Sequence, residues 1–135
     1  MHLICRAGKP RTLYRRGPGT ASNTVVERSL GNALEYSIRM VVDFVRAQHA
    51  QAPNEPILLT GYSRGAAGVV EVARRLKGGQ GILGSHPPIR VRALMLFDCV
   101  DRDLYIHTMR IPDNVGVVKH VMRSPSAASR ESFNN

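Results

Sequence analysis

Ile57-Leu58-Leu59-Thr60-Gly61-Tyr62-Ser63-Arg64-Gly65 is the stretch of sequence that decides the fold. Its first four residues form an apolar run of strand length, and the Gly-x-Ser-x-Gly pattern that follows predicts a tight turn. After the turn, apolar residues recur at helical spacing from Val69 to Leu76, and Gly78-Gly79 end the helix. A strand that leads through a glycine-bounded turn into a helix is typical of α/β proteins.

The segments on either side of this stretch continue the alternation of helices and strands. Apolar residues at helical spacing predict a long amphipathic helix over 24–50, with Thr24 and Glu27 as a capping box at its start. The nearly continuous apolar run 91–97 predicts a buried parallel strand. The valine-rich run 115–122 predicts a further strand. We therefore expect an α/β fold with a parallel sheet and right-handed crossovers.

Four shorter segments complete the expected organisation. Residues 12–15 fit a short strand, and residues 78–88 fit a loop because they are rich in Gly and Pro. Residues 1–11 and 124–135 show no periodicity and are expected to be irregular. The whole chain of 135 residues is long enough for one domain with a real core.

Composition narrows the classes of function. The formal net charge is +9, which suits nucleic acid, an anionic membrane surface or nothing beyond solubility. The basic residues are dispersed and do not alternate with aromatic residues as in proteins that stack single-stranded bases, so a nucleic-acid-binding domain ranks last. Cys5 and Cys99 lack the spacing of a metal site, and we expect neither a metal nor a cofactor. No apolar stretch has the length of a bilayer span, and the first residues lack the apolar region of a secretory signal.

The Gly-x-Ser-x-Gly turn predicts that Ser63 is a nucleophile. A serine hydroxyl reacts when a base removes its proton and the backbone presents its oxygen to the substrate. A turn this tight forces Ser63 into strained backbone angles, and we expect Gly61 and Gly65 because a Cβ at either position would clash. The N–H group of Arg64, at the start of the helix, is a candidate donor to an oxyanion. The alternative is a glycine-rich turn with an incidental serine.

Candidate partners for Ser63 follow it along the chain in the order acid, then histidine. Asp98 comes directly after the strand 91–97, at the edge of the sheet where the sites of α/β proteins assemble. His120 lies in the last expected strand and is the candidate base. Gly19 lies in a Gly-Pro-Gly-Thr loop that would supply a second oxyanion donor. The alternatives are a strand-end carboxylate at Asp98, a half-buried structural histidine at His120 and a plain turn at Gly19.

The hexapeptide 61–66, Gly-Tyr-Ser-Arg-Gly-Ala, resembles the elbow of the α/β-hydrolase catalytic domain in type VI secretion phospholipase effectors and their bacterial and fungal relatives. The stretches 14–20, 96–100 and 111–133 resemble further segments of that family in the same order. The resemblance implies an α/β-hydrolase-like sandwich in which Ser63 cleaves carboxylic esters. It further implies a phospholipid acyl ester as substrate, and the net charge suits an anionic membrane surface.

The chain also departs from this family in three places. One is the stretch Met122-Arg123-Ser124-Pro125, which stands where family members have an Ala-rich segment after their first histidine. The Asp-Gly-Thr strand turn that opens family members is absent, and so is their later Gly-x-His-x-Asp-x-Gly-Gly motif, which carries a histidine. Either His120 is the base of a minimal member, or the chain is a truncated piece of a larger protein and the base is missing. In the second case the chain is a catalytically inactive hydrolase-like binding module. Secretion-system effectors need no cleavable signal, so both a cytoplasmic and a secreted protein fit the sequence.

Overall fold

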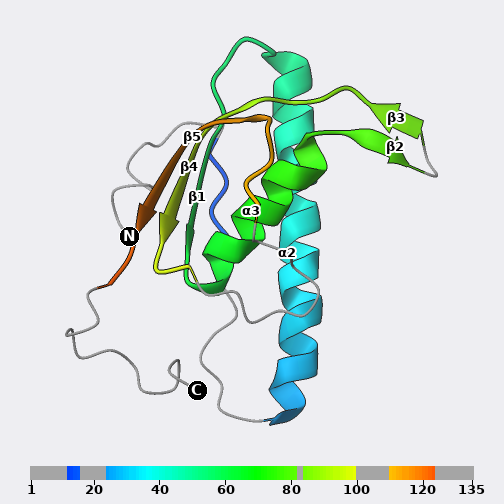
Figure 1. The fold of residues 1–135 in the computed structure, drawn as a ribbon. Helices are drawn as coiled ribbons and strands as arrows, with labels where there is room; N and C mark the ends of the chain where they lie inside the picture. The colour runs from blue at the N-terminus through cyan, green and yellow to red at the C-terminus, as the bar shows by residue number, and fades with distance from the viewer. Residues whose placement is uncertain (1–11, 16–23, 82–83, 100–109, 124–135) are drawn as a thin grey trace.

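The computed structural model describes residues 12–15, 24–81, 84–99 and 110–123 (Figure 1). Strands β1, β4 and β5 form a parallel sheet in that order, and β2 and β3 form a separate antiparallel hairpin. Both described helices lie on the same side of the sheet (Figure 1). The described part of the chain is therefore a small α/β structure. Its elements are α2 (Thr24–Gln51), β1 (Leu58–Tyr62), α3 (Arg64–Leu76), β2 (Gly79–Gly81), β3 (Gly84–His86), β4 (Val91–Phe97) and β5 (Val115–Val121).

The helices and strands with clear hydrophobic periodicity are confirmed. These are the long helix α2, the helix α3 that follows Ser63, and the strands β1, β4 and β5. The strand predicted over 57–60 continues to Tyr62, because Gly61 and Tyr62 still pair with residues of β4. The expected α/β class with a parallel sheet is thus confirmed for the described residues.

Two predictions for the shorter segments are wrong. Residues 12–15 form no strand, and Arg15 instead lies over the ring of Tyr36 in α2, 5.7 Å from its centroid. The stretch 78–88 contains the hairpin of β2 and β3, which backbone hydrogen bonds hold although glycine is depleted in strands. The terminal segments expected to be irregular, 1–11 and 124–135, lie outside the described residues.

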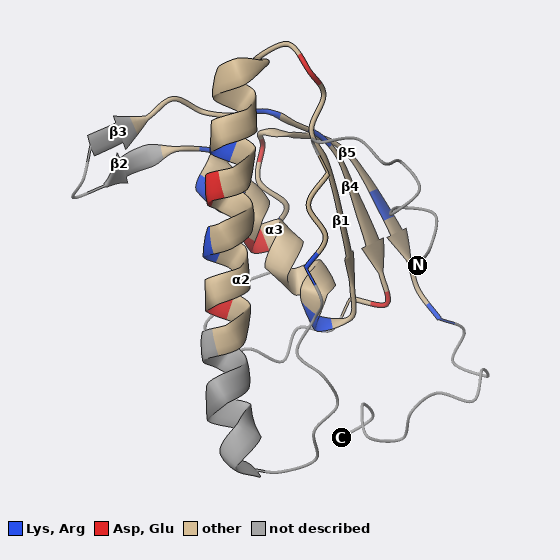
Figure 2. Cartoon of the chain, turned by 180° about the vertical axis from the view of Figure 1, so that it is seen from behind, with Lys and Arg blue, Asp and Glu red and all other residues tan. Residues whose placement is uncertain are grey.

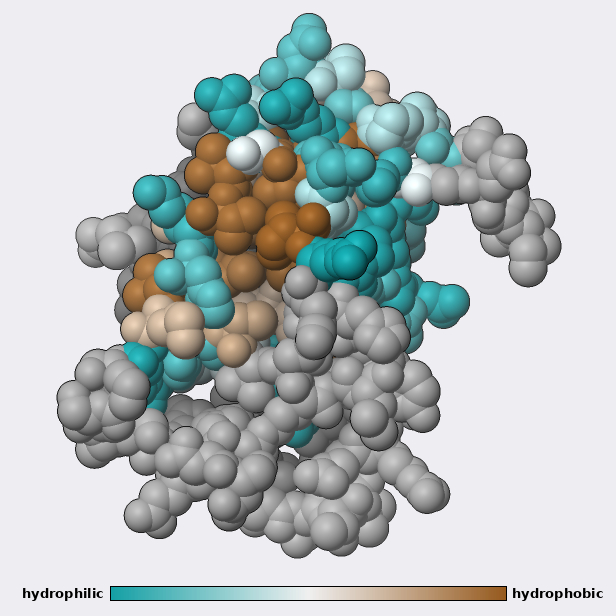
Figure 3. Space-filling view, in the orientation of Figure 1, coloured by the Kyte–Doolittle hydropathy of each residue, from teal (hydrophilic) through white to brown (hydrophobic). Residues whose placement is uncertain are grey.

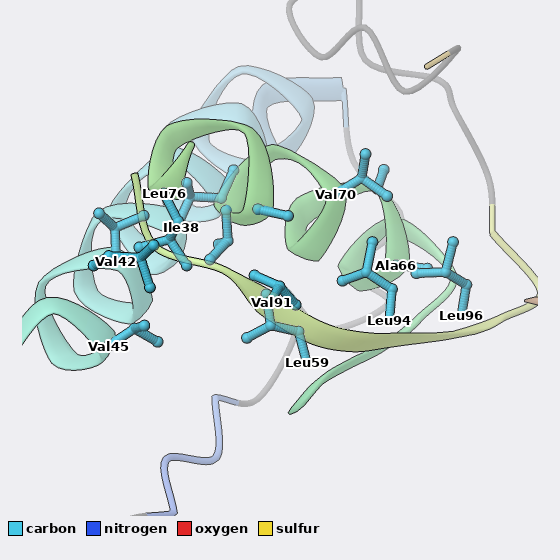
Figure 4. Close-up of a cluster of buried hydrophobic side chains, with 14 of the residues drawn as sticks. Ile38, Val42, Val45, Leu59, Ala66, Val70, Leu76, Val91, Leu94 and Leu96 are labelled. Carbon is cyan, nitrogen blue, oxygen red and sulfur yellow. The ribbon is translucent and has the colours of Figure 1, made fainter. Parts of the chain in front are cut away.

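The core lies between the sheet and the helices. Helix α3 packs on β1 and β4, and α2 packs on α3. Figure 4 shows Leu94 and Leu96 pointing from β4 toward α3, beside Ala66 and Val70. A Cβ on Gly68 would meet Leu34 of α2 at 3.2 Å, so the glycine lets the two helices approach closely. Over the strands next to α3 the surface is apolar, whereas α2 presents a hydrophilic surface (Figure 3).

An ion-pair cluster joins the two helices. Arg75 of α3 donates two hydrogen bonds to Glu35 of α2, at 2.8 Å and 2.7 Å, and a third at 3.0 Å to Glu71 of its own helix. The hydrogen bonds from Arg75 hold the pKa of Glu35 below its ordinary value, although partial burial opposes this shift. The pair with Glu35 also raises the pKa of Arg75. The cluster therefore fixes α2 on α3 while both groups are charged.

We expect Glu35→Gln to lower the free energy of unfolding at neutral pH by up to about 1 kcal/mol, as for other partly exposed ion pairs. The folded pKa of Glu35 is depressed, so the pair stabilises the fold above the ordinary carboxyl pKa of about 4.3. This contribution is lost as the pH falls through the folded pKa. Urea unfolding at a series of pH values measures the difference between wild type and variant, which should shrink below about pH 4.

Asp43→Asn is the matched control, because Asp43 is an exposed carboxylate of the same helix. We expect this variant to unfold with nearly the wild-type free energy at neutral pH. A difference between wild type and Glu35→Gln that stays constant from neutral to acidic pH would contradict the role assigned to the Glu35–Arg75 pair.

Candidate active site

The carboxyl ends of the three parallel strands meet at one edge of the sheet (Figure 1). Ser63 follows Tyr62 of β1 and Asp98 follows Phe97 of β4, and Tyr62 and Phe97 are paired in register. The Ser63 N–H donates to the carbonyl of Phe97 at 2.8 Å, and the Asp98 N–H donates to the carbonyl of Val121 at 2.8 Å. These bonds extend the backbone ladder by one residue beyond each strand, so Ser63 and Asp98 lie on neighbouring strand ends.

The backbone of Ser63 is strained, as the sequence predicts. Its φ is 54° and its ψ is −123°, and Ser63 and Asp98 are the two non-glycine residues with positive φ in the described part of the chain. Such a conformation costs about 1–3 kcal/mol and persists where the surroundings enforce it. Here the Ser63 N–H is bonded to β4, while its carbonyl accepts a 3.0 Å hydrogen bond from the Ala66 N–H. The strand and the helix thus enforce the turn from both sides.

The two glycines of the turn have different roles. A Cβ on Gly61 would overlap the carbonyl oxygen of Gly65 and lie 2.6 Å from its carbonyl carbon and 2.7 Å from the Cα of Ala66. A Cβ on Gly65 would meet nothing within 4 Å. The predicted clash is therefore confirmed at Gly61 and wrong at Gly65. Gly65 contributes the backbone atoms that β1 approaches. A side chain at Gly65 would extend into open space.

The start of α3 is the positive end of a helix next to the serine. The first N–H groups of a helix lack intrahelical partners and attract negative charge. Helix α3 begins at Arg64, and its first turn contains no acidic residue. The Arg64 N–H, directly after Ser63, is thus placed to donate to an oxyanion. Gly19, the second predicted donor, lies outside the described residues.

Asp98 is held by an arginine that sequence reasoning did not single out. Nη2 of Arg123 lies 3.3 Å from Oδ2 of Asp98, and it donates a 3.0 Å hydrogen bond to the hydroxyl of Tyr62. Arg123 thus links groups at the ends of β1 and β4 from its position just after β5. The sequence signal is weak, because a basic residue two positions beyond a strand is common and its partners are distant along the chain.

His120 is placed away from Ser63. It pairs with Leu96 on the far side of β4, and neighbouring strands are about 4.8 Å apart, so β5 lies roughly 10 Å from β1. Its Nε2 accepts a 3.3 Å hydrogen bond from the Cys99 N–H. This bond directs the ring toward the backbone after β4, and among the described residues no hydrogen bond joins the ring to Ser63. In this arrangement the His120 side chain is a hydrogen-bond acceptor for the backbone that follows β4.

The structure therefore brings together three of the predicted site residues. Ser63, Arg64 and Asp98 lie at one edge of the sheet, and within the described ranges no hydrogen bond joins Ser63, Asp98 and His120 to one another. Searched over its described residues, the chain shows no group of three or more His, Cys, Asp or Glu side chains that could hold a metal ion. The end of the sheet thus combines a serine at positive φ, the N-terminus of α3 and a carboxylate on the next strand end.

We expect Gly61→Ala to lower the free energy of unfolding by about 3 kcal/mol or more, because the new Cβ overlaps backbone atoms that side-chain repacking cannot move. Gly65→Ala is the matched control, with the same chemical change four residues away. It should unfold within about 1 kcal/mol of wild type, because alanine favours a helix over glycine. Urea unfolding of both variants makes the comparison. Equal destabilisation by the two substitutions would contradict the roles assigned to the glycines.

The chain was compared with protein-family models, with curated proteins and with solved structures, and none of the three comparisons found a match. In the part of the chain that is described, no helix combines the length and the apolar character needed to cross a membrane.

Proposed function

We propose that the protein is a serine-dependent carboxylic ester hydrolase that acts through an acyl-enzyme on Ser63. The backbone of Ser63 carries the proposal: a serine at positive φ stands between a parallel strand and the N-terminus of a helix. Strain of this kind concentrates at active sites, and this turn is the one that exposes the nucleophile of α/β-hydrolases. The resemblance of 61–66 to the elbow of phospholipase effectors adds the substrate class, a phospholipid acyl ester.

In the proposed reaction Ser63 Oγ attacks the acyl carbonyl carbon and forms a tetrahedral intermediate. Its negative oxygen accepts a hydrogen bond from the Arg64 N–H, at the positive end of α3. One such donor contributes about 10²–10³ to the rate in well-studied hydrolases. A general base takes the proton of Ser63 Oγ and passes it to the leaving oxygen, so the alcohol departs. The same base then takes a proton from the water that attacks the acyl-enzyme and returns it to Ser63 Oγ as the acid is released.

The proposed base is a histidine outside the described residues, oriented by Asp98. This choice follows from the position of His120, whose ring is bonded to the Cys99 N–H two strands away from Ser63. Asp98 lies on the strand end next to Ser63, and its Oδ2 faces Arg123. In this proposal the second carboxylate oxygen of Asp98 accepts a hydrogen bond from the histidine N–H.

A second function, a hydrolase-like module that binds without cleaving, is favoured by one observation. Both candidate partners of Ser63 are engaged elsewhere, Asp98 with Arg123 and His120 with the backbone of Cys99. In that case the elbow remains as a structural feature of the fold. Folded protein that neither reacts with serine-directed probes nor turns over short-chain esters would support this function.

A fluorophosphonate probe tests the proposed nucleophile. We expect wild-type protein to be labelled, Ser63→Ala to remain unlabelled, and Ser37→Ala, a control serine on α2, to be labelled at the wild-type rate. His120→Gln should react within about threefold of wild type, because removing a true base costs about 10²-fold or more. Mass spectrometry of peptides locates the label. An unlabelled wild type, or equal labelling of Ser63→Ala, would overturn the proposal.

A further inference from the structure

The side of the sheet that faces away from the helices is apolar and exposed. Side chains of paired residues in neighbouring strands lie on the same face, and successive residues alternate between faces. Leu59, Leu94 and Leu96 are buried on the helix side, and the exposed residues between them point the other way. We name this second side the open face; its large side chains are Leu58, Tyr62, Met95, Phe97, Val117 and Val121.

The exposure of the open face is substantial. Leu58 is 66% exposed and Val121 is 54% exposed, and every strand of the sheet contributes at least two of the six side chains. Parallel sheets are normally covered on both faces, and large contiguous apolar patches mark sites where another molecule binds. Among the described residues, the open face therefore has the character of a surface that binds an apolar partner.

The charged side chains of the sheet indicate whether a partner of the open face would be anionic or cationic. Lys119 lies in register with Met95, in the middle of the open face, and Arg123 reaches the Tyr62 hydroxyl at its end. Strands β1, β4 and β5 contain no acidic residue, and Asp98, at the end of β4, is paired with Arg123. Figure 2 shows acidic residues on the helices and in the loops instead. The whole chain carries a net charge of +9, which favours a partner that is anionic as well as apolar.

We propose that the open face docks on the surface of an anionic lipid bilayer. The aliphatic and aromatic side chains would enter the boundary between headgroups and acyl chains, while Lys119 keeps its charge at the lipid phosphates. Tyr62 directly precedes Ser63, so docking brings the edge with the nucleophile to the lipid. The choice of lipid as the partner rests on the proposed function, whereas the binding itself does not require the reactivity of Ser63.

Vesicle co-sedimentation tests the docking surface. Ser63→Ala protein is mixed with vesicles of phosphatidylcholine alone or of phosphatidylcholine with an equal amount of phosphatidylserine. We expect binding to the anionic vesicles that weakens with salt, and much weaker binding to the neutral ones. Lys119→Gln should lower the partition coefficient roughly fivefold. Val121→Ser, which removes apolar surface at an exposed position, should lower it roughly tenfold.

Two matched controls separate the open face from the rest of the surface. Arg39→Gln removes one exposed positive charge from α2, and Met40→Ser removes one exposed apolar side chain from the same helix. Both should bind like the parent protein, and circular dichroism checks that each variant is folded. If the α2 variants weaken binding as much as the open-face variants, attraction of the net charge explains the binding and the proposed surface is wrong.

Two further outcomes would overturn the docking proposal. One is failure to bind anionic vesicles at low salt. The other is a stable dimer in sedimentation experiments that Val121→Ser converts to a monomer, since a second copy of the chain would then be the partner of the open face. Labelling of Ser63 in wild-type protein is measured separately, so failure of the docking proposal and failure of the proposed hydrolase activity remain distinguishable.

Discussion

The close approach of Gly61 to the backbone of Gly65 is the constraint on which the rest of the site depends. The end of β1 and the first turn of α3 touch without a side chain between them, and this contact leaves Ser63 at a φ of 54°. The strain is held by hydrogen bonds to Phe97 of β4 and from Ala66 of α3. The stable packing of α3 on the sheet therefore maintains an unfavourable conformation at one residue.

The contact between Gly61 and Gly65 also places the positive end of α3 beside Ser63. Because the turn is so short, the residue after Ser63 is already the first residue of α3, and its N–H group points out of the helix end. The ladder between β1 and β4 then places Asp98 on the next strand end. The register of β1 and β4 thus brings Ser63 and Asp98 to neighbouring strand ends, and the short turn places the Arg64 N–H beside Ser63. His120 of β5 does not lie beside Ser63, because β4 separates β5 from β1.

Sequence reasoning succeeded where the physical signal is local. The apolar spacing of α2 and α3, the continuous run of β4 and the Gly-x-Ser-x-Gly turn each predict their own structure, and these predictions are confirmed. Prediction from the sequence failed where contacts between backbone atoms determine the structure. Gly61 and Gly65 are equivalent in the sequence pattern, but only the first faces backbone atoms in the fold. The hairpin of β2 and β3 rests on backbone pairing that its glycines do not signal.

The contacts of Arg123 and His120 show a second limit of prediction from sequence, which is that contacts between distant segments are not encoded locally. Arg123 bonds to Tyr62 and Asp98, which are far away along the chain, so the contact exists only after β5 has joined the sheet. His120 has the right order in the sequence for a triad, but order along the chain does not encode the number of strands between two side chains. The exposure of the open face could not be predicted from the sequence either. A strand with apolar side chains on both sides is expected to be buried on both faces of the sheet.

The most direct test of the central claim is to trap the acyl-enzyme. Protein is mixed with p-nitrophenyl butyrate, quenched in acid within the first turnover and digested for peptide mass spectrometry. The account predicts a butyryl group on Ser63, in the peptide that also contains Gly61 and Gly65. An acyl group found only on lysines or histidines, with Ser63 unmodified while p-nitrophenol is released, would contradict it.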